Sequence, residues 1–407
     1  MSRRVSAGSI PKHGPDGLPL SGIRVLDLSR DIAGPSCAQH LGDLGADIVK
    51  VEHPQRGDEI RLWRPRYRAS STYFLVSNRN KRGMNLDLKS ERGRKILVEL
   101  VSRSQVVVEN FRHSAASGLR LTFDDLKKIN PSIVLCSIRG YGRGAKQDRP
   151  AYDAAIQAFS GIMSVTGQLN GDVARVGVAL VDFSTGLYAA LGVLAALRQS
   201  EKTGRAIHIE VSLYDTAIAT MAYQLVTYFM TGQVITRGGS SHPAMAPARV
   251  FMTATDAVFI MAGNDRHWQL LSQALGKEEW AADERFRTND SRVKHRDEVH
   301  SMVETILRSQ PLLDWANEFD RLGVPYAPVR SVDQVANDPD VVGSMIGAIR
   351  DADGQQVRLV RSPIILDGAP LPITKVPPDQ GQDTAEILRE LGFEQSYVLE
   401  LQADGVV

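Results

Sequence analysis

The sequence predicts an α/β fold, with a doubly wound parallel sheet in a large domain and a smaller α+β domain after it. Two observations predict this fold. Short apolar runs alternate with helical patterns from residue 24 to residue 230, as expected for strands buried on both faces of a parallel sheet. After about residue 232 the alternation stops, and hairpin and helix patterns replace it. We therefore expect right-handed crossovers in the first part and a separate unit in the second.

The segment after residue 20 has the pattern of a βαβ unit. The run 24–28 predicts a buried strand, the turn from Ser29 to Pro35 leads into a helix, and Gly45 follows as a helix C-cap. The same alternation then continues along the chain. We expect strands at 24–28, 47–52, 84–88, 105–110, 133–138 and 207–211, and helices at 36–44, 90–102, 123–129, 153–161, 182–200 and 214–230.

The second half predicts a smaller unit and a return to the first. A hairpin is expected at 249–261, helices from 267 to 319, a second hairpin around 351–354 and a last helix at 384–391. An amphipathic helix at the end needs an apolar surface to cover, and the first domain offers one. The predicted organisation is a flexible tail (1–20), a large Rossmann-like domain (21–215, completed by 370–407), a linker helix (216–235), a small α+β domain (236–330) and a linker returning to the large domain (331–369).

Composition is that of an ordinary soluble globular protein. Lys and Arg number 48 against 47 Asp and Glu, so no strong field favours a nucleic-acid or membrane partner. No apolar run approaches the roughly 18 residues of a membrane-spanning helix. Two cysteines, Cys37 and Cys136, argue against a disulfide-stapled secreted fold. Pro and Gly within residues 1–20 argue against a mitochondrial presequence, and a secretory apolar region is missing, so we expect a cytoplasmic protein.

Several common site types do not fit the sequence. A dinucleotide-binding enzyme should carry Gly-x-Gly-x-x-Gly after its first strand, where this chain has SRDIAGP at 29–35. Walker A, His-Glu-x-x-His and Gly-x-Ser-x-Gly motifs are all missing from the sequence. The 9 histidines are scattered without ligand spacing, so we expect no metal site.

Asp182 is the most informative residue. It is the lone carboxylate of the apolar run 177–191, where small residues give way to a helical pattern. Such an Asp is either a helix N-cap, which accepts hydrogen bonds from backbone N–H groups, or a chemical group. Taken alone, the cap is the commoner case.

Several strings, in order along residues 20–407, make the chain similar to the class III CoA-transferases of the CaiB/BaiF type. No single string is specific, but the ordered set is. The strings are LSGIRVLD (20–27), AGP (33–35), LGDLGADIVKVE (41–52), NKR (80–82), VENFR (108–112), RGYG (139–142), YD (152–153), the Asp182 segment and GVV (405–407).

The resemblance implies a mechanism in which Asp182 is the nucleophile. Its carboxylate attacks an acyl-CoA thioester, giving a mixed anhydride and CoA thiolate, and the thiolate returns to form an aspartyl-CoA thioester while the first acid leaves. An acceptor acid then reverses the sequence. A carboxylate suits this task because it exchanges with other carboxylates at almost no net free-energy change. The CoA thioester is a substrate, and no tightly bound cofactor is expected.

The resemblance also assigns the other site residues. Tyr152 and Asp153 are active-site neighbours of the nucleophile, although Asp153 could instead be a plain helix cap. The cationic candidates for CoA phosphates could equally be solvated surface charges. A glycine-rich flap is expected over the intermediate, since glycine permits the backbone changes of a closing lid. The CoA-binding positions are Ile32, Ala33, His53, Leu86, Lys89, Asn110, Phe111, Arg112, Arg139 and Tyr141, and the flap and substrate positions are Gly238, Gly239, Ser240 and His242.

Departures from the family pattern restrict the substrate. Ile32 stands where the formyl-CoA-transferase branch has a glutamine, so formate and oxalate are disfavoured. No histidine adjoins Asp153, which disfavours an α-methylacyl-CoA racemase-type isomerase. Other strings (80–82, 242–243 and 323–329) resemble the branch that uses succinyl-CoA and dicarboxylates such as glutarate, whose distal carboxylate could meet His242 or Arg249. A non-catalytic CoA-binding protein is the remaining alternative.

The resemblance implies a particular assembly as well. In this family each chain is a ring made of a large and a small domain, and two rings interlock as a homodimer. The partners expected for this chain are therefore acyl-CoA, a free carboxylic acid and a second copy of itself, without nucleic acid or membrane.

Overall fold

The computed structural model describes residues 17–144 and 146–407, so most of the tail expected at 1–20 lies outside the described residues. The chain divides into two compact units. The first contains the described residues up to Ile162 together with Val176–Val226 and Asp340–Val407. The second contains Met163–Arg175 and Thr227–Pro339.

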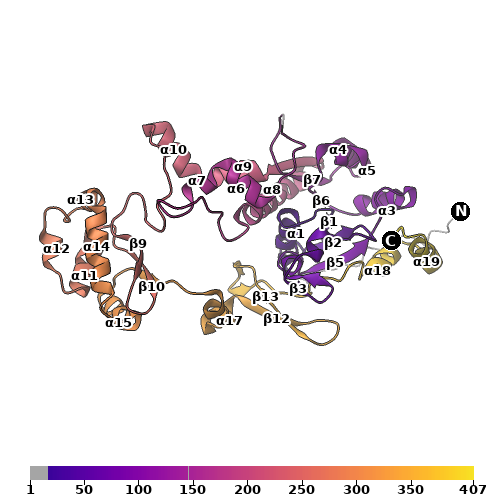
Figure 1. Ribbon diagram of the computed structural model, residues 1–407. Coiled ribbons are helices and arrows are strands. Elements are labelled where there is room, and N and C mark those ends of the chain that lie inside the picture. The colour runs from indigo at the N-terminus through magenta and orange to yellow at the C-terminus, as the bar shows by residue number, and fades with distance from the viewer. Residues whose placement is uncertain (1–16, 145) are drawn as a thin grey trace. The chain divides into compact units, whose positions relative to one another are not determined.

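A six-stranded parallel sheet is the centre of the first unit, which confirms the predicted α/β class (Figure 1). Its strand order, β5-β2-β1-β6-β7-β8, reverses direction between β1 and β6. In doubly wound sheets the carboxyl ends of the strands at such a switch point form the ligand crevice. The strands are β1 (Arg24–Asp27), β2 (Asp47–Glu52), β5 (Lys81–Asn85), β6 (Val106–Glu109), β7 (Val134–Arg139) and β8 (Ile207–Ser212).

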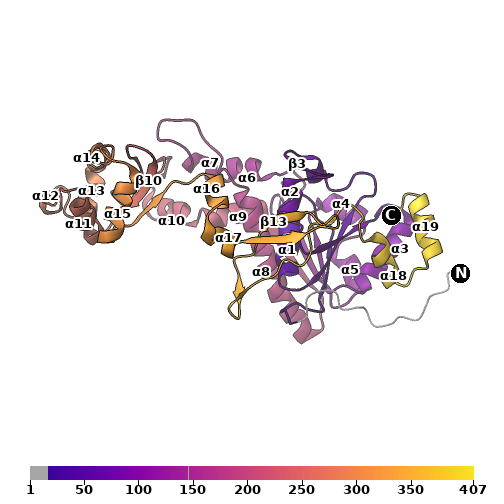
Figure 2. The same cartoon turned by 90° about the horizontal axis from the view of Figure 1, so that it is seen from below.

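Helices cover both faces of this sheet (Figure 2). Val25 belongs to the apolar cluster beneath α1 (Ala33–Asp43) and α8 (Leu180–Thr203). Its neighbour Leu26 belongs to the cluster on the other face, because successive strand residues point to opposite sides. That second face is covered by α3 (Glu91–Ser102), α5 (Phe123–Ile129), α18 (Thr384–Glu390) and α19 (Gln395–Ala403).

Two element predictions were wrong in detail, and a second terminal helix was not predicted. The strand expected at 84–88 begins at Lys81, because Lys81 and Arg82 find buried ionic partners inside the sheet. The helix expected at 214–230 is two helices, α9 (Leu213–Thr220) and α10 (Ala222–Thr231), separated at Met221. A second terminal helix, α19, follows α18 after Gly392, whose φ of 90° ends the first one.

Among the described residues, α8 is the one helix with the length and hydropathy of a membrane span. In this fold one side of it packs on α1, β7 and β8, while Leu187 and Leu191 are exposed.

The remaining elements of the first unit are short. Asp153 begins α6, and Arg112 precedes α4 as its N-cap. These elements are η1 (Glu59–Leu62), β3 (Arg66–Tyr67), β4 (Ser70–Ser71), α2 (Thr72–Leu75), α4 (His113–Gly118), α6 (Asp153–Ser160), β12 (Ile346–Arg350), β13 (Gln356–Val360), β14 (Ile365–Leu366) and β15 (Ala369–Pro370). Two further helices lie at the boundaries between the units, α7 (Ile162–Val165) and α17 (Pro339–Ser344).

The second unit has an antiparallel sheet of order β11-β10-β9 and a set of helices. The hairpin predicted at 249–261 is present as β9 (Ala248–Met252) and β10 (Ala257–Met261). Trp268 and Trp315 lie in the core of this unit, and Trp268 stacks on Trp280 at 6.0 Å between ring centroids. The other elements are β11 (Tyr326–Pro328), α11 (Asp265–Ala274), α12 (Glu279–Ala282), α13 (Asn289–Lys294), α14 (Arg296–Leu307), α15 (Leu312–Leu322) and α16 (Val332–Ala336).

Candidate active site

The loop after β1 lies at the switch point and is held by the loop after β6. The side-chain amide of Asn110 accepts a hydrogen bond from the backbone N–H of Arg30 at 3.0 Å and donates one to the Arg30 carbonyl at 2.8 Å. The next residue, Asp31, adopts a left-handed conformation with a φ of 62°. This conformation is unfavourable for a residue with a Cβ, and it persists where neighbouring contacts enforce it.

Fully buried ion pairs support the same loop from below. The ammonium group of Lys50 donates to the Ser29 carbonyl and to the Asp58 carboxylate, each at 3.0 Å. The other oxygen of Asp58 accepts a hydrogen bond from the Asp31 backbone N–H at 3.3 Å. Lys81 pairs with Asp27 at 2.8 Å, and burial lowers the pKa of Lys81 to about 8 despite this partner. Because each buried charge has a partner, the loop has a rigid base.

Asp182 lies in the first turn of α8, and Asp153 caps that helix. One carboxylate oxygen of Asp153 accepts hydrogen bonds from the backbone N–H groups of Val181, at 2.8 Å, and Asp182, at 3.1 Å. Its other oxygen accepts from the Gln157 amide at 2.6 Å. The N-cap position itself is Ala179, whose side chain makes no capping bond. The alternative in which Asp182 is the N-cap is therefore wrong, because a carboxylate from another helix satisfies those N–H groups.

The environment of Asp182 makes its carboxylate unusually basic. Burial, followed by the charges of Asp153 and Asp31, raises the pKa of Asp182 to about 7. The pKa of Asp31 is itself raised to about 6, first by burial and then by Asp58 and Glu59. Like charges and desolvation both disfavour the ionised form, and such shifts are common at functional sites.

Asp31 was missed in the sequence analysis. The available signal was its position: an acidic residue in the turn after the first strand, directly before the first helix.

Apolar residues lie between this loop and the start of α8. Ile32 is buried in a small cluster with Ile60 and Phe74, against which Ala179 packs. Ala33 is also buried, and α8 approaches it closely at Gly186, where an added Cβ would lie 2.9 Å from the Ala33 carbonyl oxygen. The side of the site formed by Ile32 and Ala33 is therefore apolar and closely packed.

His53, directly after β2, lies within electrostatic reach of several basic side chains. Burial and then Arg56 lower the pKa of His53, Asp87 opposes this shift, and Arg30 and Lys89 lower the pKa further. Arg30 also lies over the Phe111 ring, 5.9 Å from its centroid. His53 and Lys89 were predicted, whereas Arg30 and Arg56 were not. Arg112 is exposed.

Other predicted positions are interior. Arg139 forms a buried ion pair with Glu109 at 2.7 Å and donates to the Phe111 carbonyl at 2.6 Å. Tyr141 packs edge-on against Phe159, and Leu86 belongs to the core of the sheet. These three side chains are almost fully buried, so they do not present themselves to a ligand at the surface.

By contrast, Tyr152 is 58% exposed and forms the N-cap position of α6.

The glycine pair at 238–239 belongs to the second unit and forms a turn, in which the Ser241 N–H donates to the Gly238 carbonyl at 3.0 Å. Gly239 has a φ of 62°, and a Cβ there would lie 2.7 Å from the Gln168 side-chain oxygen. The Gly239 N–H donates to the Gly167 carbonyl at 2.9 Å. Beside this turn is an open cavity of about 380 Å³, lined by Gly167, Gln168, Gly171, Asp172, Ala174 and Gly239.

The hydrogen bonds around this turn continue into β9. The Ser240 hydroxyl accepts from the Val250 N–H at 3.1 Å, and the His242 N–H donates to the Ala248 carbonyl at 2.9 Å. Arg249, the other predicted cation, pairs with Glu304 at 3.0 Å. Glu304 therefore largely neutralises the charge of Arg249 within the second unit.

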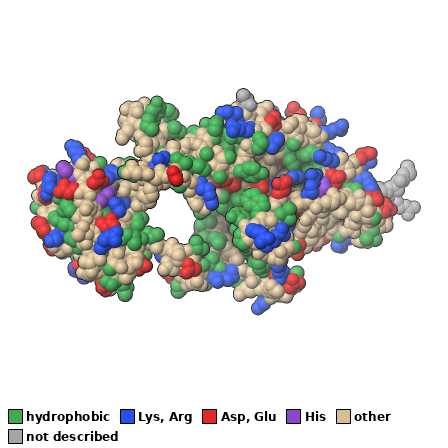
Figure 3. Space-filling view, in the orientation of Figure 1, with side chains coloured by type: hydrophobic (Ala, Val, Ile, Leu, Met, Phe, Trp, Pro, Cys, Tyr) green, Lys and Arg blue, Asp and Glu red, His purple; other side chains and the backbone are tan. Residues whose placement is uncertain are grey.

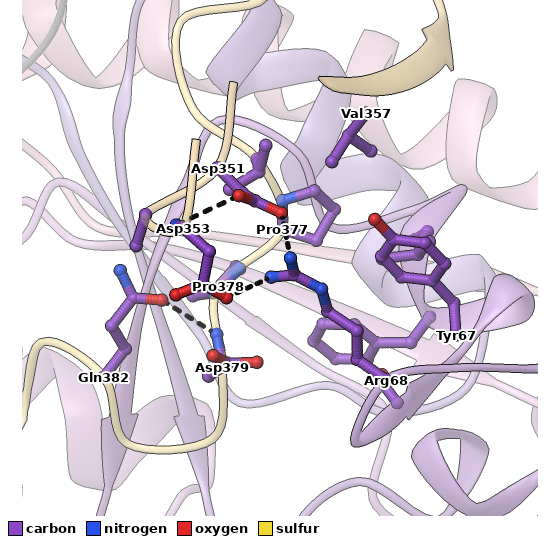
Figure 4. A pocket seen from close by; sticks show the side chains of 14 residues that line it. Tyr67, Arg68, Asp351, Asp353, Val357, Pro377, Pro378, Asp379 and Gln382 are labelled. Carbon is purple, nitrogen blue, oxygen red and sulfur yellow. Dashed lines mark hydrogen bonds and ion pairs between the residues drawn. The ribbon is translucent and has the colours of Figure 1, made fainter. Parts of the chain in front are cut away.

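A cavity of about 110 Å³ in the first unit is lined by none of the predicted site residues (Figure 4). The Arg68 guanidinium points between Asp351, at 2.7 Å, and Asp353, at 3.1 Å. The carboxylates of Asp351 and Asp353 are thus paired by the chain itself, and Arg68 ties the β12–β13 hairpin to the segment after η1. No group of three or more His, Cys, Asp or Glu side chains within residues 17–144 and 146–407 is arranged to hold a metal ion.

Comparison with known proteins places this chain in a family. The model of "CoA-transferase family III" matches residues 20–384. The succinate–glutarate CoA-transferase of Agrobacterium fabrum is 35% identical, covering 92% of this chain and 96% of the relative. The acetyl-CoA:oxalate CoA-transferase of Acetobacter aceti is 36% identical, covering 79% of this chain and 83% of the relative. The crystal structure of a CAIB/BAIF family protein from Brucella suis matches with a TM-score of 0.83 and 35% identity, covering 92% of this chain and 99% of that one. This chain therefore belongs to CoA-transferase family III and is a CoA-transferase.

Proposed function

We propose that the protein transfers CoA from a donor such as succinyl-CoA to a free short-chain dicarboxylic acid, with Asp182 as the nucleophile. The observation that carries the proposal is the setting of Asp182. It is a partly buried, basic carboxylate in the first turn of α8, in electrostatic reach of the loop at the switch point of the sheet. The names of related family members, which include succinate, glutarate, citramalate and mesaconate, support the dicarboxylate.

The proposed chemistry begins when the Asp182 carboxylate attacks the thioester carbonyl. The C–S bond breaks, leaving an acyl-aspartyl anhydride and CoA thiolate. The thiolate attacks the aspartyl carbonyl, forming the aspartyl-CoA thioester and releasing the donor acid as a carboxylate. An acceptor carboxylate then repeats these steps in reverse. Asp182 loses its charge in the first step, so repulsion from Asp153 and Asp31 is relieved as the reaction proceeds.

Apolar packing near Asp182 favours transfer over hydrolysis. Both covalent intermediates react with water, and the apolar side chains of buried Ile32 and Ala33 and partly buried Ala179 limit access to them. The basic group around His53 is suited to the CoA phosphates, since cations at loop ends form charge-assisted hydrogen bonds with phosphate oxygens. We assign Arg30 and Arg56 to this group beside His53 and Lys89.

Two alternatives fit less well. A racemase-type isomerase needs an acid and a base free to move a proton, whereas both oxygens of Asp153 accept hydrogen bonds that hold α8 and α6. Oxalate as the acceptor is favoured by one relative's name, but buried Ile32 offers no hydrogen bond to so small and polar an acid.

We further propose a lid function for the turn at 238–241 and a cytoplasmic location.

We also propose the family's interlocked homodimer of ring-shaped chains. Large apolar side chains reach the surface of the described chain at several places (Figure 3). On α8 these are Leu187 and Leu191, 56% and 64% exposed, and on α10 they are Phe229 and Met230, 67% and 76% exposed. Exposure on this scale is typical of a surface that another chain covers.

The test is a panel of acyl-CoA donors and free acids, read by mass spectrometry, with wild type, Asp182→Ala and the exposed-site control Asp124→Asn. Asp182→Ala should lower transfer at least roughly a thousandfold, as loss of a nucleophile does, while the control transfers normally. Hydroxylamine should inactivate wild type only when acyl-CoA is present, because only then does an acyl-aspartate exist. Undiminished transfer by Asp182→Ala would contradict the mechanism.

A further inference from the structure

Asp31 occupies an enforced conformation in the loop beside the start of α8, where Ala179 packs against the cluster that contains Ile32. It is a non-glycine residue in the left-handed region, with a φ of 62°. Asn110 fixes the preceding residue through two hydrogen bonds, and Asp58 fixes the Asp31 N–H from the other side. Asp58 is held in turn by fully buried Lys50. Three side chains from other parts of the chain, those of Asn110, Asp58 and Lys50, thus stabilise this one turn.

The carboxyl group of Asp31, unlike its backbone, is left without a partner. Within the described parts of the chain, no hydrogen bond or ion pair reaches its oxygens, whereas those of Asp153 accept three hydrogen bonds. The charged groups facing Asp31 are the carboxylates of Asp58, Glu59 and Asp182 and the cations of Lys50 and Arg30. Lys50 is already engaged by Asp58. Asp31 is therefore the carboxyl of this group that takes up a proton with least disruption.

The proposed reaction poses an electrostatic problem at this place. Its second half requires a free acceptor acid, a carboxylate, to approach a site that already contains two other carboxylates. Asp182 is uncharged at that stage, since it is a thioester of CoA, and the oxygens of Asp153 are already engaged as acceptors of three hydrogen bonds. Lys50 is paired with Asp58, and we assign Arg30 to the CoA phosphates, so protonation of Asp31 is the remaining way to remove the repulsion.

We propose that Asp31 binds the proton that allows the acceptor acid to enter. It takes one proton from solvent when the acceptor binds, donates a hydrogen bond from its carboxyl O–H to the acceptor carboxylate, and returns the proton to solvent when the new acyl-CoA leaves. No bond to carbon forms or breaks at Asp31. This inference rests on the proposed transfer function and adds to it an acceptor-recognition residue.

The proposal has a kinetic signature. If one proton enters with the acceptor, the KM for the acceptor acid should rise about tenfold for each pH unit above the pKa of Asp31, about 6 in the free protein. The KM for donor acyl-CoA should show no such rise, because a thioester brings no carboxylate to the reacting end. In Asp31→Asn, whose amide resembles the neutral acid and tolerates the left-handed conformation, the acceptor KM should become independent of pH.

The direct test measures proton uptake without catalysis. Asp182→Asn keeps the nucleophile position neutral, as it is in the thioester, so Asp182 itself takes up no proton. Glutarate binding to this variant is measured by calorimetry at pH 7 in two buffers of different ionisation enthalpy. We expect uptake of close to one proton, and none in Asp31→Asn/Asp182→Asn. The matched pair Asp124→Asn/Asp182→Asn, altered at an exposed carboxylate of α5, should keep the uptake.

The outcomes separate this inference from the function on which it rests. Glutarate binding without proton uptake, or an acceptor KM that keeps its pH dependence in Asp31→Asn, would overturn the role of Asp31 and leave the transferase intact. Absence of both binding and transfer with every acid of the panel would overturn the proposed function and this inference with it.

Discussion

At the scale of single residues, the site is governed by charges that the fold keeps close together. Burial and two neighbouring carboxylates raise the pKa of Asp182, while the oxygens of Asp153 accept three hydrogen bonds. The same residue type therefore has different roles in one site, and the number of donors around each carboxylate decides which role it takes.

The raised pKa of Asp182 predicts how stability depends on pH. Its folded-state pKa of about 7 exceeds the value of about 3.9 for an unfolded Asp, so the folded protein binds more protons between these values and loses stability as the pH rises through them. Asp182→Asn should therefore be more stable than wild type at pH 8, by roughly 2 kcal/mol after allowance for partial exposure, and the difference should shrink toward pH 5. Urea unfolding followed by circular dichroism measures it, and equal stability at both pH values would contradict the assigned shift.

At the scale of elements, the turn at 238–241 contains two glycines with different requirements. Gly239 needs a positive φ and has the Gln168 side chain 2.7 Å from a prospective Cβ, whereas Gly238 shows no positive φ and would meet only the Ser241 carbonyl at 3.4 Å. One glycine is therefore required by the conformation of the turn, and the other is tolerant of a methyl group.

This asymmetry predicts unequal effects of the two single substitutions. Gly239→Ala should distort the turn and, if the turn is a lid, slow transfer by roughly tenfold or more and increase hydrolysis of the thioester. Gly238→Ala is the matched control and should change both rates much less. Transfer and hydrolysis rates are read together by mass spectrometry. Unchanged rates in Gly239→Ala would show that the turn only connects neighbouring segments.

At the scale of the whole molecule, apolar periodicity was sufficient to predict the parallel sheet but not its charged strand. Val25 and Leu26 lie in runs whose burial is evident from sequence alone. Lys81 begins β5 although its charge looks like a surface signal, because its partner Asp27 is 54 residues away along the chain. Ion pairs of this kind depend on tertiary structure, so they cannot be predicted from local sequence patterns.

The candidate site was predictable to a similar degree. Asp182 and Asp153 were recognised as candidates by resemblance to the family, but the capping of one helix by the other residue depends on the packing of α6 against α8. Asp31 was not predicted because its importance comes from a backbone conformation and from neighbours that follow other strands, Asp58 after β2 and Asn110 after β6.

The exposed apolar side chains predict the state of the protein in solution. Wild type should sediment as a dimer, and Phe229→Glu, which places a charge on the 67% exposed position of α10, should shift it toward monomer. Arg308→Glu on an exposed helix end is a control for the added charge and should remain a dimer. Light scattering coupled to gel filtration measures both. A wild type that is monomeric at all concentrations would contradict the assembly.

The capping of α8 by Asp153 also limits how the protein could be re-engineered. A racemase-type proton transfer on this fold would need Asp153 to exchange protons freely. Adding a histidine beside Asp153 looks like the simplest way to introduce that activity. Yet each protonation of Asp153 would weaken the acceptor that holds the Val181 and Asp182 N–H groups, so the start of the helix would loosen in step with turnover. A designer would first have to supply α8 with a new cap, for example a Ser at position 179, before asking Asp153 to do other work.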